Sequence, residues 1–334
     1  MRAYERLLNY VKVWTTSDEE STTSPTTARQ FDLAKQLVEE MKGMGIEDAM
    51  MDEYGYVYGH IPATPGYENC TAIGFLAHMD TAPDYSGENV NPQIIENYDG
   101  KDVVLGTSGR TLTVKDFPSL KNMTGKTLIT TDGTTLLGAD DKAGIAEIMT
   151  VAEELLKGDI PHGNVCLAFT TDEEVGSGAC HMDLERFGAP YAYTVDGGPE
   201  GEIQFENFNA ASAEFVIHGV NVHPGEAKDI MVNSMKIAME LQGMLPEQEA
   251  PEHTEGYEGF FHLMEMNGSV EETTMSYLIR EFDAEKYEAR KALMQEITAK
   301  INAKYGEGTV ELKLEDSYRN MREKIEPCMQ LIDY

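Results

Sequence analysis

The sequence predicts an α/β fold with a mainly parallel central sheet and a second, inserted domain of the ferredoxin-like type. The chain has 334 residues, more than the roughly 250 to 300 at which one hydrophobic core usually stops growing. Short apolar runs alternate with helical patterns over residues 1–208, as they do in α/β proteins. Over residues 209–320 the order becomes strand, helix, strand, strand, helix, strand, which is typical of a ferredoxin-like unit.

Four short apolar runs in the first part of the chain predict buried strands, because each ends in polar residues. They span residues 72–79, 127–131, 164–171 and 191–195. Apolar residues at helical spacing predict amphipathic helices over 28–44 and 142–156. This alternation favours a parallel sheet covered by helices.

The inserted part contains four predicted strands and two predicted helices. The strands span 211–220, 260–266, 274–283 and 308–316, and the helices span 233–245 and 284–306, with Asn233 as a candidate N-cap. We therefore expect the first part of a catalytic domain at 1–208, an inserted lid or dimerisation-like domain at 209–320, and a return to the catalytic domain at 321–334.

Composition narrows the function classes. The formal charge of −33 disfavours nucleic-acid and anionic membrane partners, because such a surface repels phosphate. No apolar run reaches the roughly 18 residues of a membrane helix, and the first residues lack a signal-peptide core, so we expect a cytoplasmic protein. The four cysteines form no CxxC pair, which argues against a disulfide framework or a thiolate zinc site.

Two polar pairs follow the first two predicted strands. His78 and Asp80 stand two residues apart at the end of a strand, so their side chains point the same way. One can bind a metal while the other holds the imidazole ring. Asp140 and Asp141 precede the predicted helix, where a single aspartate would serve as the N-cap. The second carboxylate is then available to bridge two metal ions.

Acidic residues also follow the last two strands. Asp172, Glu173 and Glu174 follow the 164–171 run, and Asp196 follows the next. Each pattern alone also fits a polar strand end, a helix cap or a solvated loop. Together they stand where open α/β sheets build their sites. One histidine with several carboxylates and no cysteine predicts two hydrolytic divalent ions, zinc first, with manganese or cobalt as substitutes.

Several sequence blocks resemble the peptidase T family of tripeptide aminopeptidases, within the co-catalytic di-zinc metallopeptidases that include carboxypeptidase G and aminoacylases. The blocks are LAHMDTAPD, LLGADDKAGIAEI, FTTDEEVGSGA and VDGGPEGE, and the inserted domain adds to them. The resemblance runs over nearly the whole chain. It implies a zinc-peptidase catalytic domain, hydrolysis of the N-terminal peptide bond of tripeptides in peptide catabolism, and a possible homodimer.

The resemblance also assigns roles to residues at the strand ends. It implies four metal ligands: His78, Asp140, Glu174 and Asp196. Asp140 would bridge the two zinc ions, His78 and Asp196 would complete one site, and Glu174 would belong to the other. Asp80 would orient His78, and Glu173 would be the general base. A cis peptide bond between Asp140 and Asp141 is implied as well.

Two residues of the inserted domain match substrate-binding positions of the family. His223 would help to polarise the scissile carbonyl, and Arg280 would clamp the C-terminal carboxylate of the peptide. From the residues alone, a loop histidine beside Pro224 is the favoured interpretation of His223. Arg280 likewise fits an exposed charge on a strand.

The family's second zinc takes a final histidine from a segment after the inserted domain, whereas all eight histidines here stand at or before residue 262. The chain ends at Tyr334 inside a helical pattern. We therefore expect a truncated form that binds at most one zinc tightly and has little or no peptidase activity. The alternatives are a dipeptidase or N-acyl amino acid hydrolase of the same family, and a catalytically defective peptide-binding form.

Overall fold

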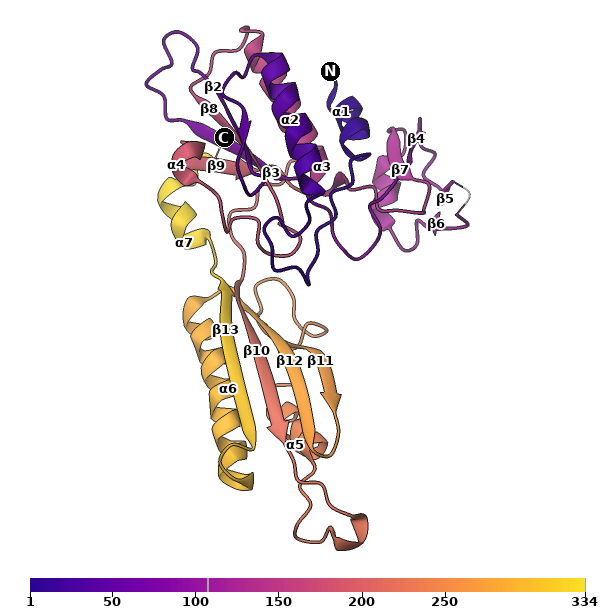
Figure 1. The fold of residues 1–334 in the computed structure, drawn as a ribbon, viewed down its shortest axis with the longest axis vertical. Helices are drawn as coiled ribbons and strands as arrows, with labels where there is room; N and C mark the ends of the chain where they lie inside the picture. Colours follow the sequence, from indigo (N-terminus) through magenta and orange to yellow (C-terminus); the bar gives the residue numbers. More distant parts are fainter. Residues whose placement is uncertain (107, 334) are drawn as a thin grey trace. The chain divides into compact units, whose positions relative to one another are not determined.

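The computed structural model describes residues 1–106 and 108–333. The chain forms two compact units, Met1–Pro199 and Glu200–Tyr334, and each has its own hydrophobic core. Figure 1 gives the order of the helices and strands along the chain. In the described part, every helix is too short or too polar to cross a bilayer.

The first unit is built on a five-stranded sheet with the order β1-β2-β8-β3-β9. Its strands are β1 (Met50–Met51), β2 (Val57–Ile61), β3 (Ile73–His78), β8 (Val165–Thr170) and β9 (Tyr191–Thr194). Strand β3 pairs in parallel with both β8 and β9, which confirms the predicted parallel centre. Strand β2 runs antiparallel to β8. It was not predicted, because Gly59 and His60 interrupt its apolar run.

Helices cover both faces of this sheet. They are α1 (Ala3–Tyr10), α2 (Gln30–Met44), α3 (Ala139–Leu156) and the short α4 (Leu184–Phe187). On one face, Leu37 of α2 and Met149 of α3 share a fully buried core with Phe169 of β8. On the other face, Phe187 of α4 packs with Tyr58 of β2. Burial of aromatic and aliphatic groups on both faces stabilises the central strands.

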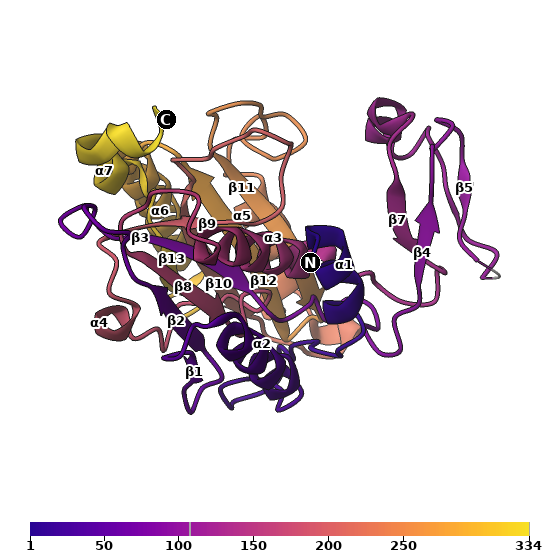
Figure 2. The same cartoon turned by 90° about the horizontal axis from the view of Figure 1, so that it is seen from above.

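An excursion between β3 and α3 forms two small ribbons that stand apart from the central sheet (Figure 2). β4 (Pro92–Ile95) pairs with β7 (Leu128–Thr131), and β5 (Val103–Val104) pairs with β6 (Thr111–Leu112); the 3₁₀ helix η1 spans Pro118–Met123. The strand predicted at 127–131 therefore exists as β7, but it lies outside the central sheet. The excursion has its own core around Tyr98, Leu105 and Leu120.

The second unit confirms the predicted ferredoxin-like order. Its elements are β10 (Asn209–His218), η2 (Pro224–Glu226), α5 (Ser234–Gln242), β11 (Phe260–Gly268), β12 (Glu272–Glu281), α6 (Ala284–Tyr305) and β13 (Val310–Tyr318), followed by α7 (Arg322–Ile325) and η3 (Glu326–Leu331). The sheet order is β11-β12-β10-β13, and every pair is antiparallel.

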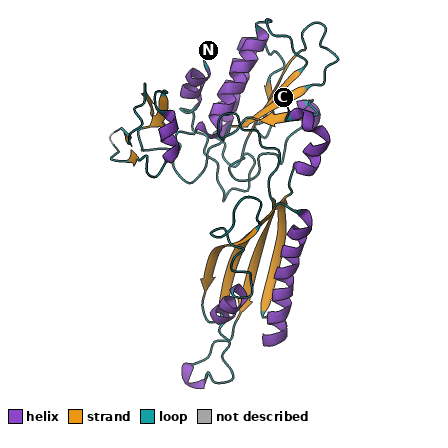
Figure 3. Ribbon diagram, turned by 180° about the vertical axis from the view of Figure 1, so that it is seen from behind, coloured by secondary structure: helices purple, strands orange, loops and turns teal. Residues whose placement is uncertain are grey.

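Both long helices of this unit lie on one face of its sheet (Figure 3). Phe215 of β10, Tyr277 of β12 and Ile297 of α6 are buried together, whereas alternate strand residues such as Glu214 face outward. Helix α5 begins at the expected cap, because the Asn233 side chain accepts from the Lys236 N–H at 3.4 Å.

Candidate active site

Polar side chains of the first unit converge where β3, β8 and β9 end. The expected residues found there, at strand ends or at the start of α3, are His78, Asp80, Asp140, Glu173, Glu174 and Asp196. Parallel strands bring their carboxyl ends to one edge of a sheet, and this is where open α/β sheets place ligand sites. The parallel pairing of β3 with its two neighbours thus explains why segments far apart in the chain meet here.

His78 is the centre of this group. It is buried, and its Nε2 lies 2.9 Å from Asp140 Oδ1, 3.8 Å from Glu173 Oε2 and 3.9 Å from Asp196 Oδ2. Burial lowers the pKa of the imidazole, but the hydrogen bond and charge of Asp80, together with other carboxylates, outweigh burial and raise that pKa to about 10. The ring nitrogen Nε2 therefore faces a strongly anionic space.

Asp80 holds both the histidine and the glutamate segment. Its carboxylate is fully buried and lies 3.3 Å from His78 Nδ1 through Oδ1. Oδ1 also accepts from the Glu173 N–H at 3.0 Å, and Oδ2 accepts from the Glu174 N–H at 3.1 Å. A carboxylate that fixes a ligand histidine in this way sets the orientation of the ring. Here the same group also fixes the backbone of both glutamates.

The two aspartates at the start of α3 have different surroundings. The Asp140 side chain is exposed and contacts His78 Nε2, whereas the Asp141 side chain is buried. Asp141 accepts from the backbone N–H of His78 at 3.2 Å and from that of Gly144 at 3.1 Å. The peptide bond between the two aspartates is cis, as the family resemblance predicts. The sequence patterns gave the pair one N-cap and one spare carboxylate, and the resemblance assigned the metal to Asp140 and no role to Asp141.

Among the residues that the structure describes, two overlapping sets of side chains have the composition of a metal site. His78, Asp141 and Asp196 form one set, and His78, Asp140 and Glu174 form the other; within each, the ligand-type atoms all lie within 4.8 Å of one another. The first set contains Asp141 at the place that the sequence analysis gave to Asp140. Imidazole and carboxylate are common zinc ligands, so the donors fit a divalent cation.

Crowding of the carboxylates supports this fit. Burial raises the pKa of Glu174 to about 6, and the charge of Asp140 adds to the effect. Burial and the nearby Asp196 raise the pKa of Asp141 to about 8. Burial also raises the pKa of Glu173. Such shifts show that further negative charge is disfavoured here, and a bound cation would reverse that penalty.

Close backbone packing sets the position of α3 against β9. A Cβ atom on Gly144 would lie 1.9 Å from Val195 O and 2.5 Å from Asp141 Oδ1. No side chain fits that space, so glycine is required where the first turns of α3 pass the end of β9. Val195 directly precedes Asp196. The close approach at Gly144 therefore fixes Asp141 and Asp196 relative to one another.

His223 and Arg280 belong to the second unit. His223 is exposed at the start of η2, where its Nδ1 accepts from the Gly225 N–H at 3.1 Å. Arg280 is half-buried near the end of β12; it donates to Ile279 O at 3.0 Å, and its guanidinium lies 5.5 Å from the centre of the Tyr318 ring.

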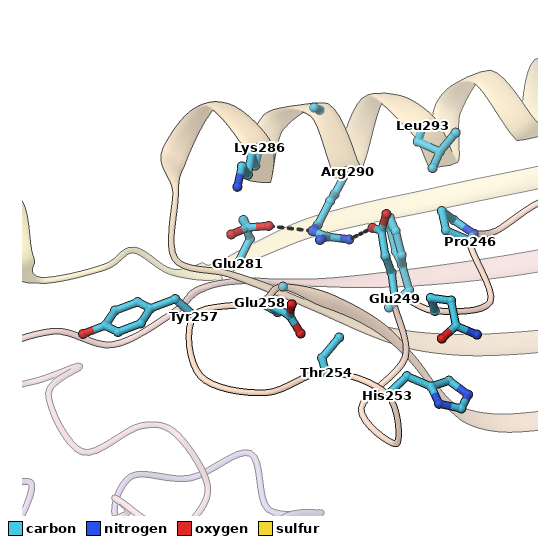
Figure 4. Close-up of a pocket in the computed structure, with 14 residues that line it drawn as sticks. Pro246, Glu249, His253, Thr254, Tyr257, Glu258, Glu281, Lys286, Arg290 and Leu293 are labelled. Atoms are coloured by element: carbon cyan, nitrogen blue, oxygen red, sulfur yellow. Dashed lines mark hydrogen bonds and ion pairs between the residues drawn. The ribbon is translucent and has the colours of Figure 1, made fainter.

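The second unit also contains an open cavity of about 700 Å³ between α6 and the loop before β11. Arg290 lies between Glu281 and Glu249 and is paired with both (Figure 4). Glu249 and Glu281, two of the glutamates that line the cavity, thus share one guanidinium as their partner.

Residues 205–309 match the peptidase dimerisation domain, and residues 124–253 match the M42 glutamyl aminopeptidase family. The chain is 56% identical over 330 residues to peptidase T of Clostridium novyi, which covers 98% of this chain and 81% of that protein. The chain belongs to the peptidase T family. The fold agrees with aminopeptidase PepT from Bacillus cereus, at a TM-score of 0.73 and 24% identity over 99% of this chain and 82% of that one.

A second solved structure has a fold similar to that of this peptidase T family member. It is a Bacillus subtilis protein described as a dinuclear metal binding peptidase from the M20 family, with a TM-score of 0.58 and 15% identity over 95% of this chain and 75% of that one. At these identities the agreement concerns the fold.

In this peptidase T family member, we predict that Gly144→Ala lowers the free energy of unfolding by about 1–3 kcal/mol, because the added methyl group has no room. The control is Gly43→Ala in α2, where no atom lies within 4 Å of the new Cβ. It should raise stability by about 0.5–1 kcal/mol, since alanine favours the helix. Chemical denaturation measures both values. Equal stability of Gly144→Ala and the unsubstituted protein would show that the close contact is absent.

Proposed function

We propose that this chain is a metal-dependent aminopeptidase that removes the N-terminal residue from tripeptides, with Glu173 as the general base. Membership of the peptidase T family supports the activity. The observation that carries the site assignment is the convergence of one buried imidazole and several carboxylates at the ends of parallel strands. We propose residues 1–208 and 321–334 for the catalytic domain and 209–320 for the lid.

We propose that His78, Asp140, Glu174 and Asp196 would hold two divalent ions. Zinc fits this donor set best, and manganese or cobalt fit as substitutes. Bound divalent ions would supply Lewis-acid activation of a water molecule. Asp141 is a further candidate, because it lies within the same 4.8 Å set as His78 and Asp196.

Two observations support Glu173 as the general base. Its carboxylate lies 3.8 Å from His78 Nε2 and is about half exposed, so it can reach both the ligand group and a bound peptide. Burial raises its pKa, which brings a carboxylate closer to the operating pH. Glu173 would take a proton on its carboxylate from water and deliver it to the nitrogen of the leaving amine.

We propose that His223 and Arg280 of the lid bind the substrate. The Arg280 guanidinium can form two parallel hydrogen bonds with a peptide carboxylate. His223 can donate to the carbonyl oxygen of the scissile bond through its exposed ring. The match of residues 205–309 to a dimerisation domain supports a homodimer. A cytoplasmic location and the absence of nucleic-acid and membrane partners remain part of the proposal.

The first test of the function is a panel of di-, tri- and tetrapeptides together with N-acyl amino acids. We predict that tripeptides are the preferred substrates and that a chelator removes the activity.

Arg280→Ala should raise KM for tripeptides about tenfold and weaken the length preference, because binding energy remote from the reacting bond is lost. The control is Lys313→Ala, an exposed charge on β13. Preference for dipeptides or acyl amino acids would overturn the substrate assignment, and an unchanged length profile would remove Arg280 from it.

The second test concerns the general base. We predict that Glu173→Gln lowers kcat by about 100-fold or more while calorimetry shows nearly unchanged zinc affinity, because Glu173 is not a proposed ligand. Glu185→Gln, an exposed substitution on α4, should leave both values unchanged. Retained turnover of the zinc-loaded Glu173→Gln variant would contradict the role.

A further inference from the structure

The segment Val13–Gln30, which we call the strap, contacts three parts of the chain that carry candidate site residues. The first contact is with α3, where buried Lys142 donates through Nζ to Val13 O at 2.8 Å. The second is a parallel bridge between Thr16 and Thr81, whose hydroxyl oxygens lie 3.1 Å apart. Thr81 directly follows Asp80 in the chain. The strap is therefore bonded next to two of the segments that form the site.

The third contact is a buried cluster of hydrogen bonds around Asp172. The Thr26 N–H donates to the two carboxylate oxygens at 3.0 and 2.8 Å, and Thr26 Oγ1 donates to Oδ1 at 2.5 Å. Gln30 Nε2 donates to the same Oδ1 at 2.6 Å, while Gln30 Oε1 accepts from the Asp172 N–H at 3.2 Å. Gln30 and Asp172 are both almost fully buried. A carboxylate buried to this extent requires such donors.

This cluster controls the turn that carries the two glutamates. Asp172 has a φ of 60°, in the left-handed region that few residues other than glycine, asparagine and aspartate adopt. Its carbonyl oxygen accepts from the Ser177 N–H at 2.9 Å, which closes the turn. The next two N–H groups, of Glu173 and Glu174, are held by Asp80. The glutamate backbone is thus fixed on one side by Asp80 and on the other by the strap.

We propose that Thr26 and Gln30 are positioning residues, which act through Asp172 to aim the carboxylates of Glu173 and Glu174. The inference rests on the proposed function for the roles of the two glutamates. Neither strap residue belongs to the proposed ligand, base or substrate-binding sets. Gln30 Nε2 donates to the Asp172 carboxylate, and Gln30 Oε1 accepts from the Asp172 backbone N–H, so the two side chains need one amide and one carboxylate. Exchanging them keeps a donor–acceptor pair between residues 30 and 172, and Thr26 then donates to the one side-chain oxygen that remains at residue 172.

An exchange experiment tests this pairing. Gln30→Glu places a second carboxylate beside Asp172, and Asp172→Asn turns an amide N–H toward that of Gln30. Each single variant should lower kcat for a tripeptide by about tenfold or more with KM changed by less than about threefold, because small displacements of reacting groups reduce the rate strongly. The double variant Gln30→Glu, Asp172→Asn restores one carboxylate and one amide, and should recover kcat to within about threefold of the unsubstituted protein.

Hydrogen exchange of the 172–177 segment gives a readout that does not depend on turnover. Each single variant should speed exchange of the Glu173, Glu174 and Ser177 amides, and the double variant should restore protection. Thr26→Val is a milder variant, which removes the hydroxyl bond to Asp172 and the bond that the same hydroxyl accepts from the Asp18 N–H at 3.1 Å. It should produce a smaller change in the same direction and keep the test available if a single variant does not fold.

Asp48→Asn is the matched control, because the Asp48 carboxylate also accepts a backbone N–H, that of His60 at 3.2 Å. His60 pairs with Cys166 near the start of β8, whereas Asp172 follows the end of that strand. Equal losses in Asp48→Asn, unchanged exchange in the variants, or no recovery in the double variant would overturn the proposal. If the unsubstituted protein cleaves no peptide, the proposed function fails, whereas the exchange measurements still decide whether the strap holds the turn.

Discussion

The carboxylate of Asp80 is the group on which the arrangement of the site depends. It is fully buried, which is costly for a charged group unless donors surround it. The imidazole of His78 and the backbone N–H groups of Glu173 and Glu174 supply these donors. One side chain thus joins the end of β3 to the turn after β8, and any displacement of Asp80 would move the histidine and both glutamates together.

The second constraint is the repulsion among the carboxylates that this scaffold brings together. Raised pKa values of Glu174 and Asp141 reflect burial and the charges of their neighbours. Folding therefore assembles a site whose full ionisation is disfavoured without a cation. A metal that binds only the folded state offsets this repulsion and stabilises the protein by mass action. Asp141 accepts hydrogen bonds from the backbone N–H groups of His78 and Gly144. These bonds hold its carboxylate beside the other anions.

The sequence contained enough information to locate the strand ends but not all of the connections between them. Short apolar runs predicted β3, β8 and β9, and the polar residues at their ends predicted the site. Strand β2 escaped detection, because Gly59 and His60 break its pattern. The run that became β7 looks like a central strand, but its partner β4 lies in the excursion. The bonds from Thr26 and Gln30 to Asp172 span about 140 residues, and no local pattern encodes a contact of that kind.

The central claim is that Asp80 orders the histidine and the glutamate turn, and zinc titration calorimetry of Asp80→Asn tests it most directly. The amide has nearly the shape of the carboxylate, but it directs N–H groups toward donors and removes the charge beside His78. We expect zinc affinity to fall by about 10- to 100-fold, as is common when a group that orients a ligand histidine is changed. Hydrogen exchange of the Glu173 and Glu174 amides should accelerate in the same variant. Zinc affinity within about twofold of the unsubstituted protein, with both amides still protected, would contradict the account.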